Sequence, residues 1–202
     1  YKTIERRIDV LGVSEPSITV EGTDKIRVQL AGVTDPDEAR NIIGKAANLT
    51  FRDTNDRLLM NSDVLKSGGA KVSQDNYGQP AVSLAVENKD KFYRVTKKIS
   101  ESSDNRIVIW LDFDEETDSF SASEATCGSQ DSRCLSVASV SQGFSSDVII
   151  QGNFTQDEVT LMVDLINSGS LPTKLTEISS KTVGASFGTD TLNKTFIAGV
   201  IG

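Results

Sequence analysis

Residues 154–188 read FTQDEVTLMVDLINSGSLPTKLTEISSKTVGASFG, and this stretch predicts a helix, a stop and a strand in turn. Thr155 and Glu158 have the spacing of a capping box, so a helix should begin there. Apolar residues at helical spacing then give this helix one face to bury: Val159, Met162, Val163 and Ile166. Gly169 and Pro172 should end it, because glycine favours the C-terminal cap and proline cannot continue a helix. The residues that follow, Lys174 to Val183, have a strand-like pattern.

The N-terminal part of the chain predicts helix, strand, strand, helix and strand over residues 1–53. Apolar residues alternate on both sides of a turn at Glu21 to Asp24, which indicates a hairpin. Asp35 and Pro36 mark the start of the second helix, and Leu49 and Phe51 alternate in the strand after it. This order is most of a ferredoxin-like plait that lacks one strand, which Lys174 to Val183 would supply.

The predicted fold class is therefore α+β, with a discontinuous base and an inserted head. The base would comprise residues 1–57 plus 171–190, and the head would comprise residues 58–170. Within the head we expect a strand around Val82 to Val86, a helix at 87–100, a buried strand at Ile107 to Leu111, a hairpin of two short strands at 135–140 and 147–151, and the capped helix. Gly68, Gly69 and Gly78 are interpreted as turn glycines.

Two thin connections between base and head are predicted, and they would form a hinge. The first follows a polar run, and the second carries glycine and proline. The expected hinge residues are Arg57, Leu58, Leu59, Gly169, Ser170 and Pro172. Residues 191–202 are interpreted as the start of a membrane span or as a frayed tail.

Composition excludes several functions. The chain has 21 basic and 29 acidic residues among 202, for a net charge of −8, which argues against a nucleic-acid partner and against a basic membrane-binding patch. It contains no histidine, which excludes Ser-His-Asp and Cys-His catalysis and histidine-ligated metals. No phosphate-binding glycine motif is present, so no cofactor is expected.

Acidic residues are the remaining candidates for chemistry. Asp112, Asp114, Glu116 and Asp118 alternate as in a calcium loop, but the sixth and twelfth positions hold Thr117 and Ser123 where an EF-hand needs glycine and glutamate. A solvated acidic loop over 112–133 is the favoured interpretation. Other acidic pairs lie at helix starts, where they act as caps. We therefore expect no catalytic or metal site, and Trp110 is assigned to the core.

Four blocks of sequence resemble the SecD family of bacterial protein-export subunits. They begin at Arg7 (RIDVLGVSEP), Lys25 (KIRVQLAGVTDP), Asn48 (NLTFR) and Gly78 (GQPAV), and the 154–188 stretch completes the pattern. Ala31 stands where the family usually has proline. The resemblance implies the first extracytoplasmic domain of a multi-pass protein of the bacterial cell membrane, not an enzyme.

By the same resemblance, the partners would be SecF, a SecY-type translocon and unfolded preprotein. The head would capture the emerging chain and move relative to the base, driven by the proton gradient through membrane spans that this sequence does not contain. The sequence does not indicate which residues bind preprotein. A porter domain of a proton-driven solute exporter and a carboxylate-dependent secreted hydrolase are the alternatives; a deep pocket with converging carboxylates would favour the hydrolase.

Cys127 and Cys134 lie in the acidic loop and have neither a Cys-x-x-Cys spacing nor a third ligand. In a reducing cytosol they would be spectators or a weak redox pair. The resemblance implies an oxidising compartment, and there they would form a disulfide. We expect reduction to change global stability little but to speed proteolysis between Asp112 and Gln142.

Overall fold

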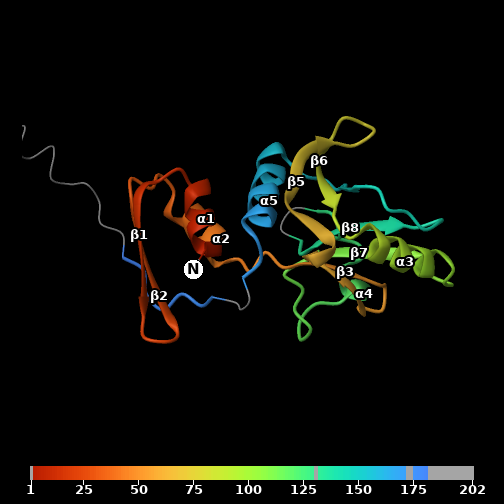
Figure 1. The fold of residues 1–202 in the computed structure, drawn as a ribbon, viewed down its shortest axis with the longest axis horizontal. Coiled ribbons are helices and arrows are strands. Elements are labelled where there is room, and N and C mark those ends of the chain that lie inside the picture. Colours follow the sequence, from red (N-terminus) through yellow and green to blue (C-terminus); the bar gives the residue numbers. More distant parts are fainter. Residues whose placement is uncertain (1, 130–131, 172–174, 182–202) are drawn as a thin grey trace, which may run out of the picture.

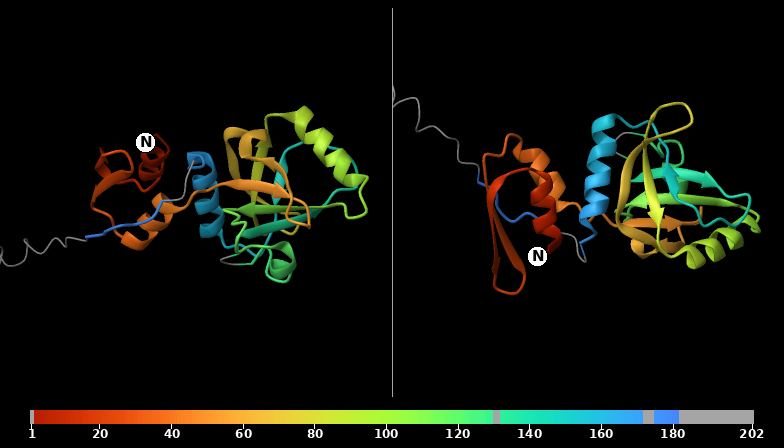
Figure 2. Two further views of the ribbon diagram at one scale, coloured as in Figure 1. Left: turned by 90° about the horizontal axis from the view of Figure 1, so that it is seen from below. Right: turned by 45° about the horizontal axis from the view of Figure 1, so that its top comes forward.

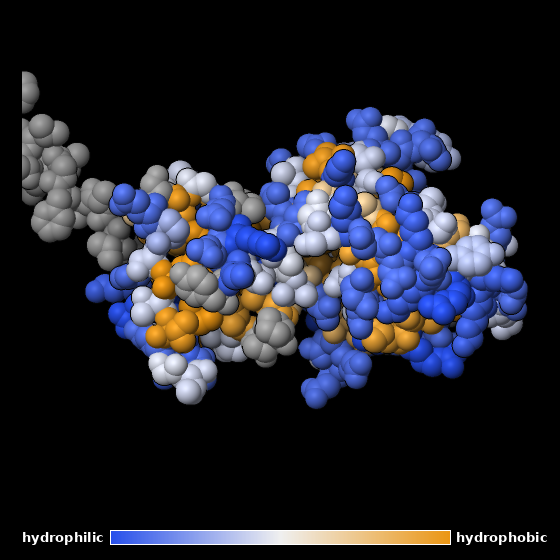
Figure 3. Space-filling model, viewed as in Figure 1, coloured by the Kyte–Doolittle hydropathy of each residue, from blue (hydrophilic) through white to orange (hydrophobic). Residues whose placement is uncertain are grey.

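A computed structural model describes residues 2–129, 132–171 and 175–181, and these form two lobes side by side (Figure 1). The small lobe comprises residues 2–44, Leu171 and residues 175–181, and the large lobe comprises residues 49–168. Two crossings, residues 45–48 and 169–170, join them. In both views of Figure 2 the chain passes between the lobes at these crossings, and Figure 3 shows the same two lobes in space-filling form. Within the described ranges, no helix is long and apolar enough to span a membrane.

The small lobe is a hairpin covered by two helices. Its elements are α1 (Lys2–Val10), β1 (Ser14–Glu21), β2 (Lys25–Ala31) and α2 (Pro36–Gly44). The predicted hairpin is confirmed, with Ile18 opposite Val28 in an antiparallel pair. Ile4, Ile8 and Leu171 form its buried core, and Leu175 packs against them. The helices lie between the hairpin and the large lobe (Figure 1).

The expected ferredoxin-like plait is not formed in the described part of the small lobe. Its sheet has two strands, and residues 175–181 have no regular secondary structure. The remainder of the predicted strand, and the tail 191–202, lie outside the described residues.

The large lobe contains two antiparallel sheets and their covering helices. One sheet has the order β4-β3-β7-β8 and the other β5-β6-β9. The elements are β3 (Leu49–Arg52), β4 (Leu58–Asn61), a 3-10 turn (Ser62–Val64), β5 (Leu65–Gln74), β6 (Pro80–Val86), α3 (Lys89–Ser100), β7 (Arg106–Leu111), α4 (Phe120–Ser123), β8 (Cys134–Ser139), β9 (Val148–Ile150) and α5 (Gln156–Ser168). The α+β class and the buried central strand β7 are confirmed.

Strand β3 corrects the predicted base. It pairs with β4 and β7, so residues 49–52 lie in the large lobe and not in the small one. All four residues of β3 are buried, because the strand is internal to its sheet and covered on both faces. Apolar alternation at Leu49 and Phe51 could not distinguish this position from the edge of a plait.

Two further predictions for the middle of the chain are wrong. Strands β8 and β9 do not form a hairpin, since β8 pairs with β7 and β9 with β6. Gly68 and Gly69 lie inside β5, where the pairing register with β6 shifts between Leu65 and Ala70. A Cβ at position 69 would lie 2.8 Å from the Lys66 carbonyl oxygen. These glycines therefore permit a bulge and not a turn.

Helix α5 forms as its sequence predicts. Glu158 Oε2 accepts from the Thr155 backbone N–H at 2.7 Å, and Thr155 Oγ1 accepts from the Glu158 N–H at 3.3 Å. Phe154 and Val159 are both buried in the large-lobe core. At the other end, the Asn167 side chain bonds both the N–H and the carbonyl of Ala70, at 2.9 and 3.0 Å. This pair of bonds fixes the end of α5 to β5.

Candidate functional site

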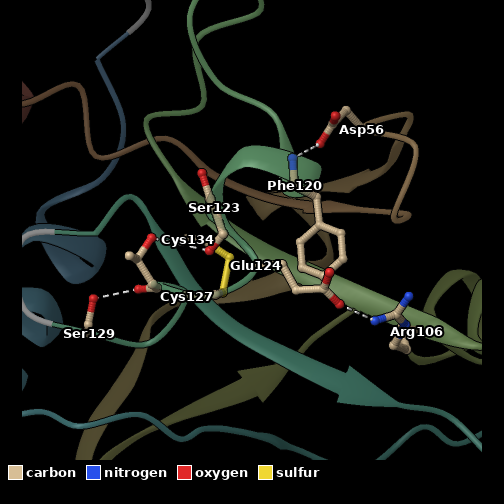
Figure 4. Close-up of a disulfide and its surroundings, with 9 residues drawn as sticks. Asp56, Arg106, Phe120, Ser123, Glu124, Cys127, Ser129 and Cys134 are labelled. Atoms are coloured by element: carbon tan, nitrogen blue, oxygen red, sulfur yellow. Dashed lines mark hydrogen bonds and ion pairs between the residues drawn. A yellow bond between two sulfur atoms is a disulfide. The ribbon is translucent and has the colours of Figure 1, made fainter.

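A hollow of about 660 Å³ opens beside β8, the edge strand of the four-stranded sheet. Arg106 from β7, Phe120 and Glu124 from the α4 turn, Ser136 and Val137 from β8, and residues 151–153 before α5 line it. Figure 4 shows Arg106, Phe120 and Glu124 on the same side of the sheet as the disulfide.

The free edge of β8 faces this hollow. Val140 N–H donates to the Asn105 carbonyl at 2.8 Å, so residues 140 and 105 form a bonded pair with β7. In an antiparallel ladder the bonding direction alternates along the strand. The backbone groups of Val137 and Ser139 therefore point away from β7 toward the open edge, where an extended chain could pair with them.

The two cysteines that the sequence predicts to pair lie in a disulfide next to this edge (Figure 4). Their Cα atoms are 4.7 Å apart, and Cys134 is fully buried as the first residue of β8. Gly128 N–H donates to the Cys134 carbonyl at 2.8 Å, and Asn153 N–H donates to the Gly128 carbonyl at 2.7 Å. The disulfide loop thus covers the beginning of the β8 edge and leaves its end open.

An ion-pair network forms one wall of the hollow. Arg106 donates to Asp104 through Nε at 2.9 Å and Nη2 at 2.8 Å, and to Glu124 through Nη1 at 2.8 Å. The hydrogen bonds from Arg106, and then from Thr54, hold the pKa of the Asp104 carboxyl far below its usual range. The bonds to Asp104 and Glu124 raise the pKa of Arg106. Both groups therefore stay charged at neutral pH, and neither would take up or release a proton there.

The acidic loop is more structured than its sequence suggests. Phe113 and Phe120 pack around the buried Trp110, and α4 forms within the loop. Asp56 Oδ1 accepts from the Phe120 N–H at 2.8 Å, which ties the loop to the β3–β4 turn. The prediction of a solvated loop over 112–133 is therefore partly wrong, because Phe113 and Phe120 extend the core around Trp110.

Acidic side chains of this loop form ion pairs and hydrogen bonds with neighbouring residues. Asp118 pairs with Arg133 at 2.9 Å, and Asp118 Oδ2 also accepts from the Asp114 N–H at 2.9 Å. Across the ranges that the structure describes, no three acidic or cysteine side chains are placed to hold a metal. A second hollow, of about 550 Å³, contains Asp56, Glu115 and Asp118. Since Glu115 contacts Arg52 at 3.5 Å and the other two are bonded as above, this is not a set of free carboxylates for hydrolysis.

The two crossings lie against each other. Leu171 N–H donates to the Ala46 carbonyl at 2.8 Å, which joins the end of one crossing to the other. Arg7, wholly buried on α1, donates to the carbonyls of both Ala46, at 3.0 Å, and Gly169, at 3.1 Å. Asn48 is held by Asp112, whose Oδ1 accepts the Asn48 N–H at 2.7 Å.

The predicted hinge residues have different positions in the structure. Leu58 and Leu59 belong to β4, which pairs with β3, and Arg57 binds Asp53 at 2.9 Å in the turn before it. This first group does not lie between the lobes, so its assignment as a hinge was wrong. Gly169 and Ser170 do lie in the second crossing, and Pro172 is outside the described residues. Their role as a hinge stays a prediction.

Sequence reasoning missed Arg7, Ala47 and Asp112. The signal for Arg7 was present, since it falls on the same helical face as Ile4 and Ile8, where a charged residue needs buried partners. Nothing local to Ala47 or Asp112 indicates their positive φ angles of 54° and 58°.

Comparison with known proteins identifies the family. Residues 1–56 match the family described as "Protein translocase subunit SecDF, P1 domain, N-terminal", and residues 46–173 match "SecDF, P1 head subdomain". The chain belongs to the SecDF family. The match beginning at residue 46 agrees with the position of the first crossing, and residues 49–168 correspond to the P1 head.

Relatives in this family cover the whole chain. It is 43% identical over 204 residues to the protein translocase subunit SecDF of Bacillus subtilis, covering 100% of this chain and 27% of the relative. It is 34% identical over 205 residues to SecD of Leptotrichia buccalis, covering 98% of this chain and 45% of that protein. The chain thus spans less than half of either relative. Both are named as translocase subunits and not as enzymes, in agreement with the expected absence of catalysis.

Solved structures support the fold. A structure described as "Structure and function of a membrane component SecDF that enhances protein export" has a TM-score of 0.71 at 23% identity, covering 90% of each chain. A SecDF structure in a "Super-membrane-facing form" has a TM-score of 0.67 at 24% identity, covering 86% of this chain and 26% of that one.

Proposed function

We propose that this chain is the part of a bacterial SecD-type export subunit that holds an unfolded preprotein on the extracytoplasmic side of the membrane. The large lobe would hold the preprotein and move relative to the small lobe, with SecF and a SecY-type translocon as partners. The proton gradient would drive this movement through membrane spans of the parent protein. The observation that carries the proposal is the arrangement of two lobes, each with a buried cluster of its own and joined by two adjacent crossings, in a chain of the SecDF family.

The binding side of the proposal rests on the β8 edge. Preproteins differ in sequence, so a site that holds them has to use groups common to all chains, and strand addition uses only the backbone. Val137 and Ser139 offer such groups beside an open hollow with some apolar lining from Phe120 and Val137. The acidic residues that line the hollow, Asp75 and Glu124, both accept hydrogen bonds from neighbouring residues, and the described residues contain no cluster placed to hold a metal.

The moving side of the proposal rests on how little joins the lobes. Ile4, Ile8 and Leu171 form one core and the residues between the two large-lobe sheets form another. Ile42 of α2 and Leu11 are the small-lobe residues that pack into the large-lobe core. A rotation at the few residues of the crossings would have to separate Ile42 and Leu11 from the large-lobe core, while the rest of each cluster stayed intact.

The test is to lock the two lobes and measure export. A pair of cysteines, one on the side of α1 that contacts α5 and one opposite it on α5, would be introduced into the full-length parent protein. Oxidation should abolish stimulation of preprotein translocation into membrane vesicles, and reduction of the same sample should restore it. Each single-cysteine variant is the control for oxidation itself. If the locked protein stimulated export as well as the reduced one, the moving-lobe proposal would be wrong, and the chain would be a static docking module.

A further inference from the structure

Arg7 is a fully buried cation that contacts both connections between the lobes. It lies on α1 with the small-lobe core residues Ile4 and Ile8 on its face. Its guanidinium donates to five carbonyl oxygens: Ile42 at 3.1 Å, Ile43 at 3.2 Å, Lys45, Ala46 at 3.0 Å and Gly169 at 3.1 Å. The first four follow one another around the end of α2, and the fifth comes from the end of α5.

The chemistry of this contact suits arginine alone. In the described part of the chain, no carboxylate lies within ion-pair distance of Arg7, so carbonyl dipoles compensate its charge at close range. Burial lowers the pKa of Arg7, and the more distant charge of Asp112 opposes this shift. The C-terminal ends of two helices supply these carbonyls, and their partial negative charge stabilises a cation. The contacts use the N–H groups of Nη1 and Nη2, while Nε has no hydrogen-bond partner among the described residues. A lysine ammonium has three donors at one point and cannot serve acceptors in as many directions.

The contacts of Arg7 join the two crossings to the small lobe. Ala46 belongs to the first crossing and Gly169 to the second, and Ala46 also accepts the Leu171 N–H at 2.8 Å. With Arg7 in place, neither crossing can swing away from α1 without leaving a buried donor unpaired, which is costly.

On the other side, the first crossing is held by the large lobe. Asn48 and Asp112 exchange two hydrogen bonds: Asn48 N–H to Asp112 Oδ1 at 2.7 Å, and Asp112 N–H to the Asn48 carbonyl at 2.9 Å. Ala46 is therefore fixed to one lobe and Asn48 to the other. Ala47 stands between them with φ of 54°, a left-handed conformation that an alanine adopts only when its surroundings impose it.

We infer that Ala47 and Gly169 are the pivots of the lobe–lobe hinge and that Arg7 is the positioning residue that holds them in one orientation. Gly169, with φ of 92°, is the matching position in the second crossing. Arg7 touches both pivot regions, and its bonds to the Ile42 and Ile43 carbonyls also join α1 to α2 within the small lobe, so the experiment has to separate these two roles. This inference concerns the geometry of the two lobes and does not require that the chain bind preprotein.

The experiment measures the distance between the lobes in the intact chain. Spin labels would be attached to cysteines at Thr23, on the small-lobe hairpin turn, and at Ser103, at the exposed end of α3. Double electron–electron resonance would then be recorded for the parent, Arg7→Lys, Arg7→Met and Arg6→Met. Arg6 is exposed on the same helix, so its substitution is the matched control.

We expect one narrow distance distribution in the parent and in Arg6→Met, and a shifted or roughly two-fold broader one in Arg7→Met, because the crossings are no longer held together. The distance distribution of Arg7→Lys should be intermediate between those of the parent and Arg7→Met. A parent-like distribution in Arg7→Met would overturn the inference.

Amide hydrogen exchange separates this effect from unfolding. The β1–β2 amides report the small lobe, and the β3–β7 amides report the large lobe. A broader distance distribution, with the amides of both lobes still protected from exchange, supports the inference. Loss of β1–β2 protection in both Arg7 variants would mean that Arg7 holds the small lobe together and not the angle between lobes, and it would also overturn the inference.

Discussion

Reduction of the Cys127–Cys134 disulfide should destabilise the whole large lobe, by an amount that the loop size predicts. The sequence separation of the two cysteines is 7. For a loop of this size the chain-entropy model gives about 2.5 kcal/mol of stabilisation through the unfolded state. Sequence alone suggested a mobile loop, in which most of this amount would not reach the global unfolding equilibrium.

The structure changes that expectation. Cys134 is the fully buried first residue of β8, and it packs in the cluster around Trp110. The loop is tied at Gly128 to both Cys134 and Asn153 by backbone hydrogen bonds. Because the loop is held at Gly128 and at the buried Cys134, most of the freedom gained on reduction belongs to the unfolded chain. Nearly the full 2.5 kcal/mol or so should therefore appear in the free energy of unfolding.

The assay is urea unfolding followed by fluorescence of Trp110, the single tryptophan. With a urea slope of about 1–3 kcal/mol/M, the loss corresponds to a midpoint lower by roughly 1–2.5 M in the reduced protein. The Cys127→Ser/Cys134→Ser variant should show a similar midpoint with or without reductant. Alkylation before unfolding establishes whether the thiols are free. An unchanged midpoint in protein with two alkylatable thiols would refute the reasoning, and two alkylatable thiols in protein taken from an oxidising compartment would refute the pairing itself.

Three further predictions concern the large lobe. Residues 46–171 expressed alone should unfold in one cooperative transition, because nearly all of the main core lies in that range. The free energy of unfolding, followed by Trp110 fluorescence, should agree with that of the whole chain to within about 1 kcal/mol. A polypeptide without a cooperative transition would mean that the lobes share one core. Hydrogen bonds from Arg106 and Thr54 lower the pKa of Asp104, so its stabilisation is complete above the ordinary carboxyl pKa of about 4 and is lost as the pH falls below it. Asp104→Asn should therefore flatten the acid side of a plot of urea midpoint against pH, and an unchanged slope would contradict this role of Asp104. Reduced and carboxymethylated α-lactalbumin, a soluble unfolded polypeptide, should bind at the β8 edge and shift the amide resonances of Val137 and Ser139. Ser139→Pro should weaken this binding about ten-fold because it removes an edge N–H, whereas Ser139→Ala should leave the affinity unchanged. Equal affinities of the two variants would exclude strand addition at β8.

Local signals in the sequence predicted the parts of the fold that depend on neighbouring residues. The capping box at Thr155, the stop at Gly169 and the hairpin around Glu21 to Asp24 each form as expected. In these cases the partners lie within a few residues of one another, so spacing alone specifies the contact. The buried run of β7 was also recognisable, because a central strand is apolar on both faces.

Strand pairing across long separations could not be predicted in the same way. Leu49 and Phe51 show a clear strand pattern, but the pattern does not say that the partner is β7, about sixty residues away. Likewise, β8 and β9 are adjacent in sequence but join different sheets. The misplaced hinge at Arg57 to Leu59 follows directly from the misplaced strand, since β3 was assigned to the wrong lobe.

The position of β7 explains how the crossings and the hollow could act together. Arg106, at the start of β7, forms part of the wall of the hollow, and Asp112, directly after its end, holds Asn48 of the first crossing. Residues 107–111 between them are buried, and neighbouring strands pair with β7 on both sides. A strand held on both sides and both faces does not bend easily, so a rotation at Ala47 carries Arg106 and the β8 edge with it. A small change of angle at Ala47 would then become a larger displacement of the β8 edge, because the sheet between them is rigid. Coupling between the crossing and the hollow would not require side-chain contacts to change along the way.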